Sequence, residues 1–184
     1  SISSPQQAMS LGMAYVPEDR LQHGLVSDMD ITSNITLPRL SDFSKFGWVL
    51  NNRERKAAYE ISCQMELRAN SIYQLTRELS GGNQQKVVLG KWLSTNPRVL
   101  ILDEPTRGID VGTKASVHQL MSELASEGMA IILISSELPE ILGMSDRIIV
   151  MREGVMTGEF SGDGATQEKI LTAATEDVRA RIGQ

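Results

Sequence analysis

Two adjacent carboxylates, Asp103 and Glu104, are the side chains of this sequence that are best placed to do chemistry. They follow the apolar run 99–102, which has no polar alternation and is typical of a parallel strand covered on both faces. Open sheets of parallel strands bind ligands beyond the carboxyl ends of those strands. One carboxylate at such a position can hold Mg²⁺, while the other orients a water molecule for in-line attack on a phosphate.

Ser80, Gly81 and Gly82 form a second feature directed at phosphate. They precede a run of helix-forming residues, so we predict a helix that starts here with Ser80 as its N-cap. The glycines let a ligand approach the backbone closely, and the free N–H groups of the first helical turn attract phosphate. These residues alone leave a second interpretation open, namely a glycine-capped helix beside an ordinary core strand.

The order and spacing of three motifs resemble the nucleotide-binding domain of an ATP-binding cassette (ABC) protein. The run 99–104 resembles the Walker B strand of that family, and 107–110, with Gly108 and Asp110, resembles its D-loop. The run 79–85 resembles the family signature, with Asn83 where glutamine is usual. The positions that correspond to nucleotide-binding residues of the signature are Leu79, Ser80, Gly81, Gly82, Asn83 and Gln84.

The resemblance implies a role for each part of this site. Asp103 would help to hold Mg²⁺ through water, and Glu104 would polarise the attacking water. The signature would close over the γ-phosphate of an ATP held by a second cassette, because cassettes of this family pair head to tail. ATP and Mg²⁺ are therefore the implied cofactors, and the signature would act in trans.

Two positions depart from the usual family pattern. Glu18 stands where a glutamine, in the Q-loop, senses Mg²⁺ and links the core to the helical subdomain; a solvated loop carboxylate is the other interpretation of Glu18. Ser136 stands where most active cassettes have a histidine that contacts the γ-phosphate. A serine can donate a hydrogen bond but carries no charge near neutral pH, so catalytic assistance at this position is in doubt.

Both departures match one subgroup of the family. The runs 14–20 and 135–137 resemble the second cassette of the tandem ATPases that energise import of monosaccharides such as ribose, galactose or rhamnose. The resemblance implies transmembrane permease subunits as partners, a periplasmic sugar-binding protein as an indirect partner, and a peripheral location on the cytoplasmic face of the inner membrane. The neighbourhood of 18–37 is expected to face the permease.

The phosphate-cradling Walker A motif, G-x-x-x-x-G-K-[ST], does not occur in the 184 residues. Family order places it upstream of the Q-loop, so we expect the C-terminal part of a cassette, without the Walker A strand, loop and helix. Such a chain should not hydrolyse ATP alone, and some apolar faces of its core should be uncovered. The alternatives are an inert fragment that docks on a permease or on a complete cassette, and a non-transport ABC ATPase.

Composition fits this interpretation. The chain is 41% hydrophobic and 22% charged with a net charge of −5, and it has no dense Lys/Arg block, so nucleic-acid binding is not indicated. Its single cysteine, Cys63, excludes an internal disulfide, and we interpret it as a small apolar residue of a helix. The longest apolar runs are far shorter than the ~18 residues of a membrane span, so any membrane role must be peripheral.

The fold expected from these features is a partial RecA-like α/β core of the P-loop NTPase class with an inserted helical subdomain. We predict one incomplete domain over 1–184, with the core in 1–20 and 97–160, the Q-loop and helical subdomain in 21–96, and a C-terminal extension in 161–184. The predicted strands cover 13–16, 99–102 and 130–134, the last of them buried, and a hairpin pairs 147–151 with 155–160. The predicted helices cover 5–10, 30–35, 52–67, 81–94, 112–127, 138–142 and 166–173.

Three local predictions complete the sequence-based picture. Asn51 and Glu54 have the spacing of a capping box at the start of the helix over 52–67. The run 38–48 lacks clear periodicity and is expected to be a loop anchored by its aromatic residues. The tail over 175–184 is polar and is expected to be helical or frayed.

Overall fold

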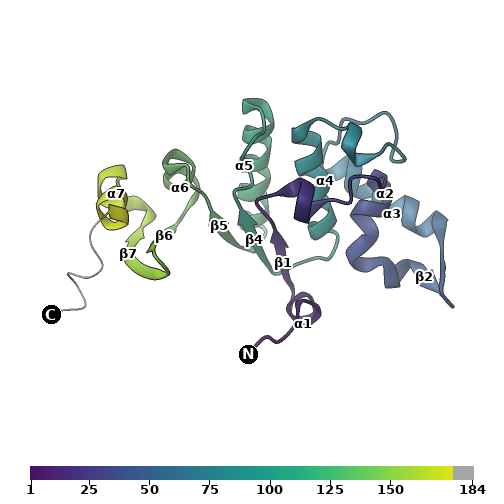
Figure 1. The fold of residues 1–184 in the computed structure, drawn as a ribbon, viewed down its shortest axis with the longest axis horizontal. Coiled ribbons are helices and arrows are strands. Elements are labelled where there is room, and N and C mark those ends of the chain that lie inside the picture. The colour runs from purple at the N-terminus through teal and green to yellow at the C-terminus, as the bar shows by residue number, and fades with distance from the viewer. Residues whose placement is uncertain (176–184) are drawn as a thin grey trace. The chain divides into compact units, whose positions relative to one another are not determined.

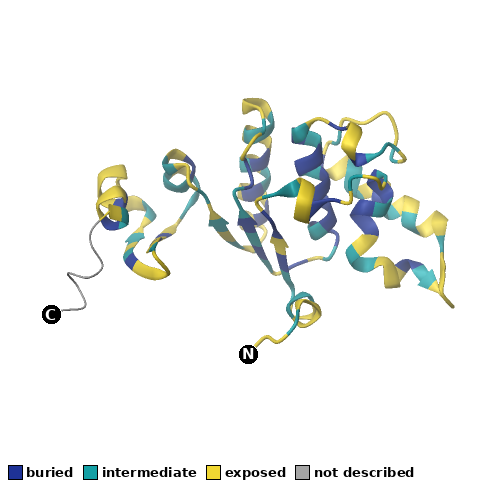
Figure 2. Ribbon diagram, in the orientation of Figure 1, coloured by how far each residue is buried: buried dark blue, intermediate teal, exposed yellow. Residues whose placement is uncertain are grey.

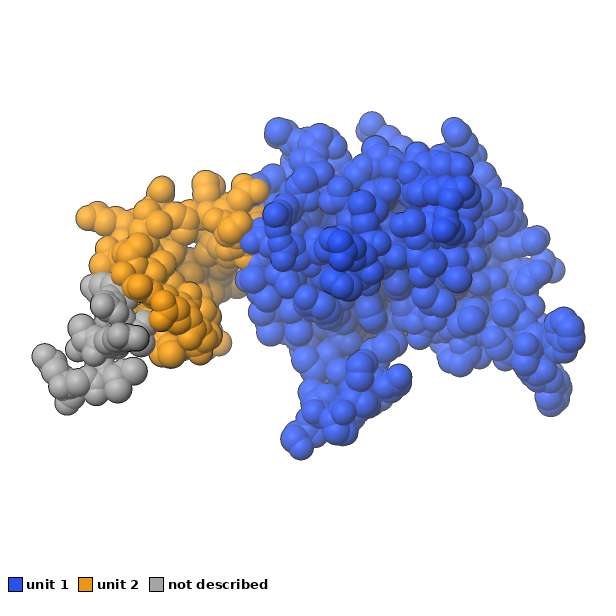
Figure 3. Space-filling view, viewed as in Figure 1, with its two compact units in different colours: residues 1–134 blue, residues 135–184 orange. Residues whose placement is uncertain are grey.

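The computed structural model describes residues 1–175 and divides the chain into two compact units (Figure 3). The first unit is Ser1–Ile134, and the second begins at Ser135. In the described part of the chain, no helix is long and apolar enough to cross a membrane.

The core of the first unit is a parallel sheet with the strand order β1-β4-β5 (Figure 1). Helix α1 (Pro5–Ser10) leads into the first strand, and the register aligns Tyr15 with Ile101 and Ile101 with Ile132. The predicted strands are therefore confirmed as neighbours in one sheet. Their bounds are β1 (Met13–Val16), β4 (Val99–Asp103) and β5 (Ala130–Ile134).

Fully buried residues, among those drawn dark blue in Figure 2, lie on only one face of this sheet. Val16, Leu100 and Leu102 are 0% exposed, on the face where α4 packs against β1 and α5 against β5. On the other face Ile132 is 50% and Ile134 is 47% exposed. The prediction of full burial for 130–134, and of cover on both faces of 99–102, is therefore wrong for this structure. The continuous apolar run predicts a strand that can be covered on both sides, but here residues on the second side are partly exposed.

Two long helices cover the buried face of the sheet. Helix α4 (Gly81–Leu93) matches its predicted bounds closely and is buried along most of its length. Helix α5 (Val111–Ser126) buries Val117, Met121 and Leu124, as its apolar periodicity predicts. It ends before Gly128, whose φ of +93° is the left-handed backbone that glycine adopts at low cost after a helix.

The segment between β1 and α4 forms the helical subdomain. Helix α2 packs against both α3 and α4, which confirms an inserted group of helices beside the sheet. Its elements are η1 (Arg20–Gly24), a π-helix, then α2 (Ile31–Thr36), η2 (Leu37–Phe43), β2 (Ser44–Lys45), β3 (Trp48–Val49), α3 (Asn51–Gln64) and η3 (Thr76–Glu78).

The run 38–48 is more regular than predicted. It forms the 3₁₀ helix η2 and a short antiparallel ribbon of β2 and β3. Only Phe43 is buried, whereas Phe46 is 92% and Trp48 is 80% exposed, so aromatic anchoring of this run is limited to one residue. Two-residue strands are too short to give a periodic pattern in the sequence.

The predicted capping box at the start of α3 is wrong. Leu50 occupies the N-cap position without a side-chain hydrogen bond, and Asn51 is already the first helical residue. Glu54 accepts a hydrogen bond of 2.8 Å from the hydroxyl of Thr36 instead. Thr36 is buried, and its hydroxyl also lies within 2.9 Å of the carbonyl of Thr32, so Glu54 is directed to this buried group and not to the start of α3. Cys63 is exposed on this helix, not packed as a small apolar residue.

The second unit is a hairpin packed against a helix. Strands β6 (Arg147–Arg152) and β7 (Val155–Ser161) pair antiparallel, which confirms the predicted hairpin. Glu153 and Gly154 both have positive φ, as a two-residue turn between twisted strands requires. The unit also contains α6 (Leu138–Met144), η4 (Gly162–Gly164) and α7 (Gln167–Thr175). The predicted tail beyond Thr175 lies outside the described residues.

Candidate phosphate-binding site

Ser80 caps the N-terminus of α4, as predicted. Its Oγ accepts hydrogen bonds from the backbone N of Asn83 at 3.4 Å and from Asn83 Nδ2 at 2.9 Å. The other end of the Asn83 amide accepts a bond of 2.9 Å from the backbone N of Arg68. The asparagine that replaces the usual glutamine therefore ties the signature turn to the segment that follows α3.

The two signature glycines are close to other atoms of the same chain. A Cβ at Gly82 would lie 2.4 Å from Thr113 Oγ1, and a Cβ at Gly81 would lie 2.7 Å from Arg20 Nη2. Gly82 is buried. The first turn of α4 thus needs glycine so that α5 and Arg20 can approach it, which is a reason the sequence did not suggest.

The D-loop is fixed by its own helix cap. Asp110 is the N-cap of α5, and its carboxylate accepts bonds from Thr113 N at 3.0 Å and from Thr113 Oγ1 at 2.7 Å. These bonds lower the pKa of Asp110, because they stabilise the ionised carboxylate. Thr113 also meets Gly82, so one residue links the D-loop helix to the signature helix.

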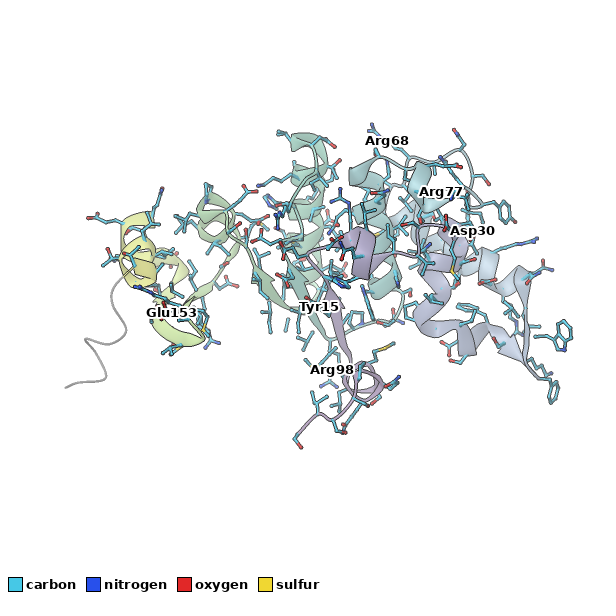
Figure 4. The ribbon with its side chains drawn as sticks, in the orientation of Figure 1. Tyr15, Asp30, Arg68, Arg77, Arg98 and Glu153 are labelled. Atoms are coloured by element: carbon cyan, nitrogen blue, oxygen red, sulfur yellow. The ribbon has the colours of Figure 1, made fainter. Side chains whose placement is uncertain are left out.

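The strand-end carboxylates lie where the sequence placed them. Asp103 is the last residue of β4, and its Oδ2 accepts a bond of 2.8 Å from the hydroxyl of Tyr15. Tyr15, on β1, is labelled in Figure 4. This bond is the main cause of the raised pKa of Tyr15, with burial contributing less. Sequence reasoning did not single out Tyr15, which pairs with Ile101 in the sheet and reaches Asp103 two residues further along β4.

Glu104 leaves the strand in an unusual backbone conformation. Its φ is +46°, in the left-handed region that non-glycine residues seldom adopt. The backbone N of Glu104 donates a 2.8 Å bond to the carbonyl of Ile134, so the end of β5 holds this turn in place. Strained backbone of this kind is concentrated at functional sites.

The donor set fits Mg²⁺ in the way that the resemblance implies. Within the described part of the chain, no cluster of three or more metal-ligating side chains exists. Mg²⁺ is commonly held by only one or two carboxylates, with waters and substrate phosphates as its other ligands. Asp103 offers an oxygen besides the one bonded to Tyr15, so a single protein carboxylate is available for such a site.

The segment at the Q-loop position contacts the D-loop. Glu18 forms an ion pair with Arg107, although both side chains remain about half exposed or more. Arg20 donates to the carbonyls of Arg107 and Gly108 at 3.1 Å and 3.4 Å. Glu18 is therefore a half-exposed loop carboxylate that is paired with Arg107 of the D-loop.

Ser136 belongs to the second unit, between β5 and α6, and its residue is exposed. The structure packs the signature turn against the D-loop, and the strand-end carboxylates lie in the same first unit, at the end of β4. Ser136 belongs to the other compact unit.

An open cavity of about 430 Å³ lies beside the signature turn. Polar side chains dominate its wall, and the exposed cap residue Ser80 is part of it. The lining residues are Arg68, Ala69, Asn70, Gln74, Glu78, Leu79, Ser80 and Asn83. The signature end of α4 is therefore accessible to a ligand.

A parallel sheet with carboxylates at a strand end, a helical insertion and a glycine-rich helix start define an α/β nucleotide-binding domain of the P-loop NTPase class. The family model for ABC transporters matches residues 3–107, which is more than half of the chain. The chain belongs to the ABC transporter family, as its motifs predicted.

Curated relatives carry names of sugar import proteins. A ribose import ATP-binding protein of Rhodococcus jostii is 57% identical over 172 residues, which is 94% of this chain and 34% of the relative. A xylose import ATP-binding protein of Geobacillus kaustophilus is 55% identical over 174 residues, 95% of this chain and 34% of the relative. The chain thus spans about a third of the length of these relatives.

Solved structures confirm the fold. A dimeric ATP-binding cassette bound to ADP and phosphate matches with a TM-score of 0.72 at 23% identity, over 89% of this chain and 69% of that one. A nucleotide-free cassette from an ABC transporter matches with a TM-score of 0.74 at 20% identity, over 96% of this chain and 70% of that one. The α/β cassette architecture predicted from the motifs is therefore confirmed.

Proposed function

We propose that this chain forms part of the ATP-binding subunit of an ABC transporter that imports a sugar, and that it supplies the signature side of a composite ATP site. The observation that carries the proposal is the Ser80-capped start of α4, which opens on a polar cavity and is packed against the D-loop helix. The names of the relatives, which are ribose and xylose import proteins, support the sugar-import part.

In this proposal the signature turn binds phosphate held by an opposing cassette. The Ser80 hydroxyl and the backbone N–H groups of Gly81 and Gly82 donate to the γ-phosphate of the ATP. The N-terminal end of the α4 dipole adds a favourable potential for that negative charge. The two cassettes would pair head to tail, and a solved cassette of this fold is described as dimeric.

A head-to-tail pair of cassettes has two ATP sites. The strand-end carboxylates would belong to the second of them, to which this chain contributes Asp103 and Glu104. Asp103 would hold Mg²⁺ through water, with Tyr15 keeping its carboxylate oriented. Mg²⁺, when bound, would neutralise charge on the phosphates of the nucleotide. Glu104, held by the end of β5, would orient the attacking water. Ser136 would supply at most a hydrogen bond, so we propose slow turnover at this half of the assembly.

The remaining partners follow from the family. We propose that the subunit lies peripherally on the cytoplasmic face of the inner membrane, bound to transmembrane permease subunits and served indirectly by a periplasmic sugar-binding protein. The neighbourhood of 18–37 is proposed as the surface that faces the permease. Cross-linking from Asp30, the partly buried N-cap of α2, should reach a permease subunit. Cross-links to a cassette alone would contradict this assignment.

A chimera tests the function as a whole. The matched part of the ribose import ATP-binding protein of Rhodococcus jostii is replaced by the corresponding residues of this chain, at 57% identity. The chimera should assemble at the membrane and restore MgATP-dependent ribose uptake to cells that lack the native protein. A folded, membrane-assembled chimera without ATP turnover or uptake would refute the proposal.

A further inference from the structure

One side chain, Arg20, joins three parts of the proposed site. Its Nη1 donates to the carbonyl of Arg107 at 3.1 Å and its Nη2 to the carbonyl of Gly108 at 3.4 Å, both in the D-loop. Its Nε donates to Gln84 Oε1 at 3.4 Å, in the first turns of α4. Arg20 itself begins the π-helix η1, directly after the Q-loop position.

The geometry of the guanidinium suits a bridge more than a ligand contact. Arginine presents its N–H donors in a rigid planar fork, so a single side chain can hold several acceptors at fixed relative positions. All three nitrogens of Arg20 already donate to this chain. The absence of a side chain at Gly81 makes room for the fork, because a Cβ there would lie 2.7 Å from Nη2.

A second contact anchors the other end of η1. Lys91 is only 8% exposed, and its ammonium donates a 2.9 Å bond to the carbonyl of Gly24, the last residue of η1. Gln84 and Lys91 lie seven positions apart on α4, two turns along one face of the helix. Helix η1 is therefore fixed to α4 at its first and last residues, and π-helical turns often occur at functional sites.

We propose that Arg20 is a positioning residue that holds the signature turn, the D-loop and η1 as one body, so that the signature meets the phosphate of a second cassette in a fixed geometry. The ion pair of Glu18 with Arg107 reinforces the same junction. The inference rests on the proposed function for its purpose, but the junction itself can be measured without nucleotide.

Hydrogen exchange in the 184-residue chain tests the junction. The amides of Gln84 and Arg107 are bonded to the carbonyls of Ser80 and Glu104, so their exchange reports local opening on either side of Arg20. Arg20→Ala should speed exchange at both amides by about 10-fold, because hydrogen bonds from a charged group are lost. The amide of Met65 at the end of α3, bonded to Ile61, should be unchanged.

Two further variants keep the test decisive. Arg20→Lys retains the charge but loses the planar fork. It should therefore slow exchange, relative to Arg20→Ala, at only one of the two amides. If Arg20→Ala does not fold, Arg20→Lys takes its place in the test. Arg77→Ala removes an exposed arginine whose side chain pairs with Asp28 and not with α4 or the D-loop, and it should change neither amide. Unchanged exchange in Arg20→Ala, a change on one side only, or equal acceleration at Met65 would each overturn the proposal.

The chimera separates this inference from the proposed function. In a working chimera, Arg20→Ala should lower kcat for ATP hydrolysis by at least ~10-fold, with KM little changed. The reason is that the signature contacts ATP only when the two cassettes have closed on each other, after ATP has bound to the opposite cassette. A kcat that does not fall would overturn the positioning role. If the unsubstituted chimera is inactive, the proposed function fails while the exchange result still decides whether Arg20 joins the two elements.

Discussion

The hydrogen bond between Tyr15 and Asp103 changes the pKa of Tyr15. The pKa of Tyr15 is raised because its hydroxyl donates to the Asp103 carboxylate and because ionisation would place two negative charges together. This bond contributes stability that is fully present below the ordinary tyrosine pKa of about 10 and is lost as the pH rises through the higher pKa of the folded protein.

Asp103→Asn should therefore bring the pKa of Tyr15 back toward its ordinary value. The substitution removes the negative charge and leaves an oxygen that can still accept a hydrogen bond. Titration of the Tyr15 ring carbon shifts in NMR spectra between pH 8 and 12 measures the change. An equal Tyr15 pKa in Asp103→Asn and in the unsubstituted chain would show that the negative charge of the carboxylate does not raise it.

Ser80 is expected to stabilise the fold as well as to face a ligand. It caps α4 through its bond to the backbone of Asn83. Ser80→Ala should lower the free energy of unfolding by about 1 kcal/mol, as is typical for loss of an N-cap. Ser116→Ala is the matched control, since Ser116 lies inside α5 and bonds only to the carbonyl of Gly112. Urea denaturation measures both; equal effects would contradict a special role for the cap.

At the scale of elements, the packing of α4 against α5 depends on the missing side chain of Gly82. A Cβ there would lie 2.4 Å from Thr113 Oγ1 and 2.9 Å from its Cγ2. Gly82→Ala should thus destabilise the fold by roughly 1–3 kcal/mol, the usual cost of overpacking. Removing the two clashing atoms with Thr113→Ala should recover part of that loss in the double variant, measured as a double-mutant cycle.

Gly143 provides the control for Gly82→Ala. It lies in α6, and a Cβ added there would meet no atom within 4 Å. Gly143→Ala should be neutral or slightly stabilising, because alanine loses less backbone entropy than glycine when a helix forms. If both substitutions had the same effect, the glycine pair of the signature would not be explained by its contact with α5.

The same elements show what the sequence could predict. Hydrophobic periodicity and residue composition predicted β1, β4, β5 and the helices α4 and α5, because amphipathic and apolar patterns reflect which residues are buried. The π-helix η1 and the β2–β3 ribbon were missed, since neither is long enough to impose a period. The bridge made by Arg20 was missed because its partners lie far away in the sequence. Gln84 is 64 residues and Gly108 is 88 residues from Arg20, and such contacts have no local signature.

At the scale of the whole molecule, Glu104 tests whether this half of the proposed assembly turns over ATP. Losing a group of this kind in an active site typically costs ~10²–10³-fold in rate. Because Ser136 carries no charge near neutral pH, we expect Glu104→Gln to reduce turnover of the chimera by much less than that. Glu60→Gln, on the exposed face of α3, is the control for a charge change alone. A fall of more than ~100-fold would show that the site with Ser136 is active.

A protein of these 184 residues should show no ATP turnover and poor ATP affinity by itself. P-loop enzymes meet the charge of the β- and γ-phosphates mainly with backbone N–H groups and one lysine of a G-x-x-x-x-G-K-[ST] run, which this sequence does not contain. Without that cradle, Asp103 and Glu104 are two negative groups facing a polyanion.

The uncovered sheet face adds a physical consequence to this prediction. Tyr15, Ile132 and Ile134 expose apolar surface on one side of the sheet, and contiguous surface of that kind favours self-association. Phosphate release and ATP titration by calorimetry should both be negative for the chain in its dispersed state, with size-exclusion chromatography confirming that state. Turnover by the isolated chain that is abolished in Glu104→Gln would show that the carboxylates and the signature helix suffice for the chemistry, and that the cradle is not the element on which hydrolysis depends.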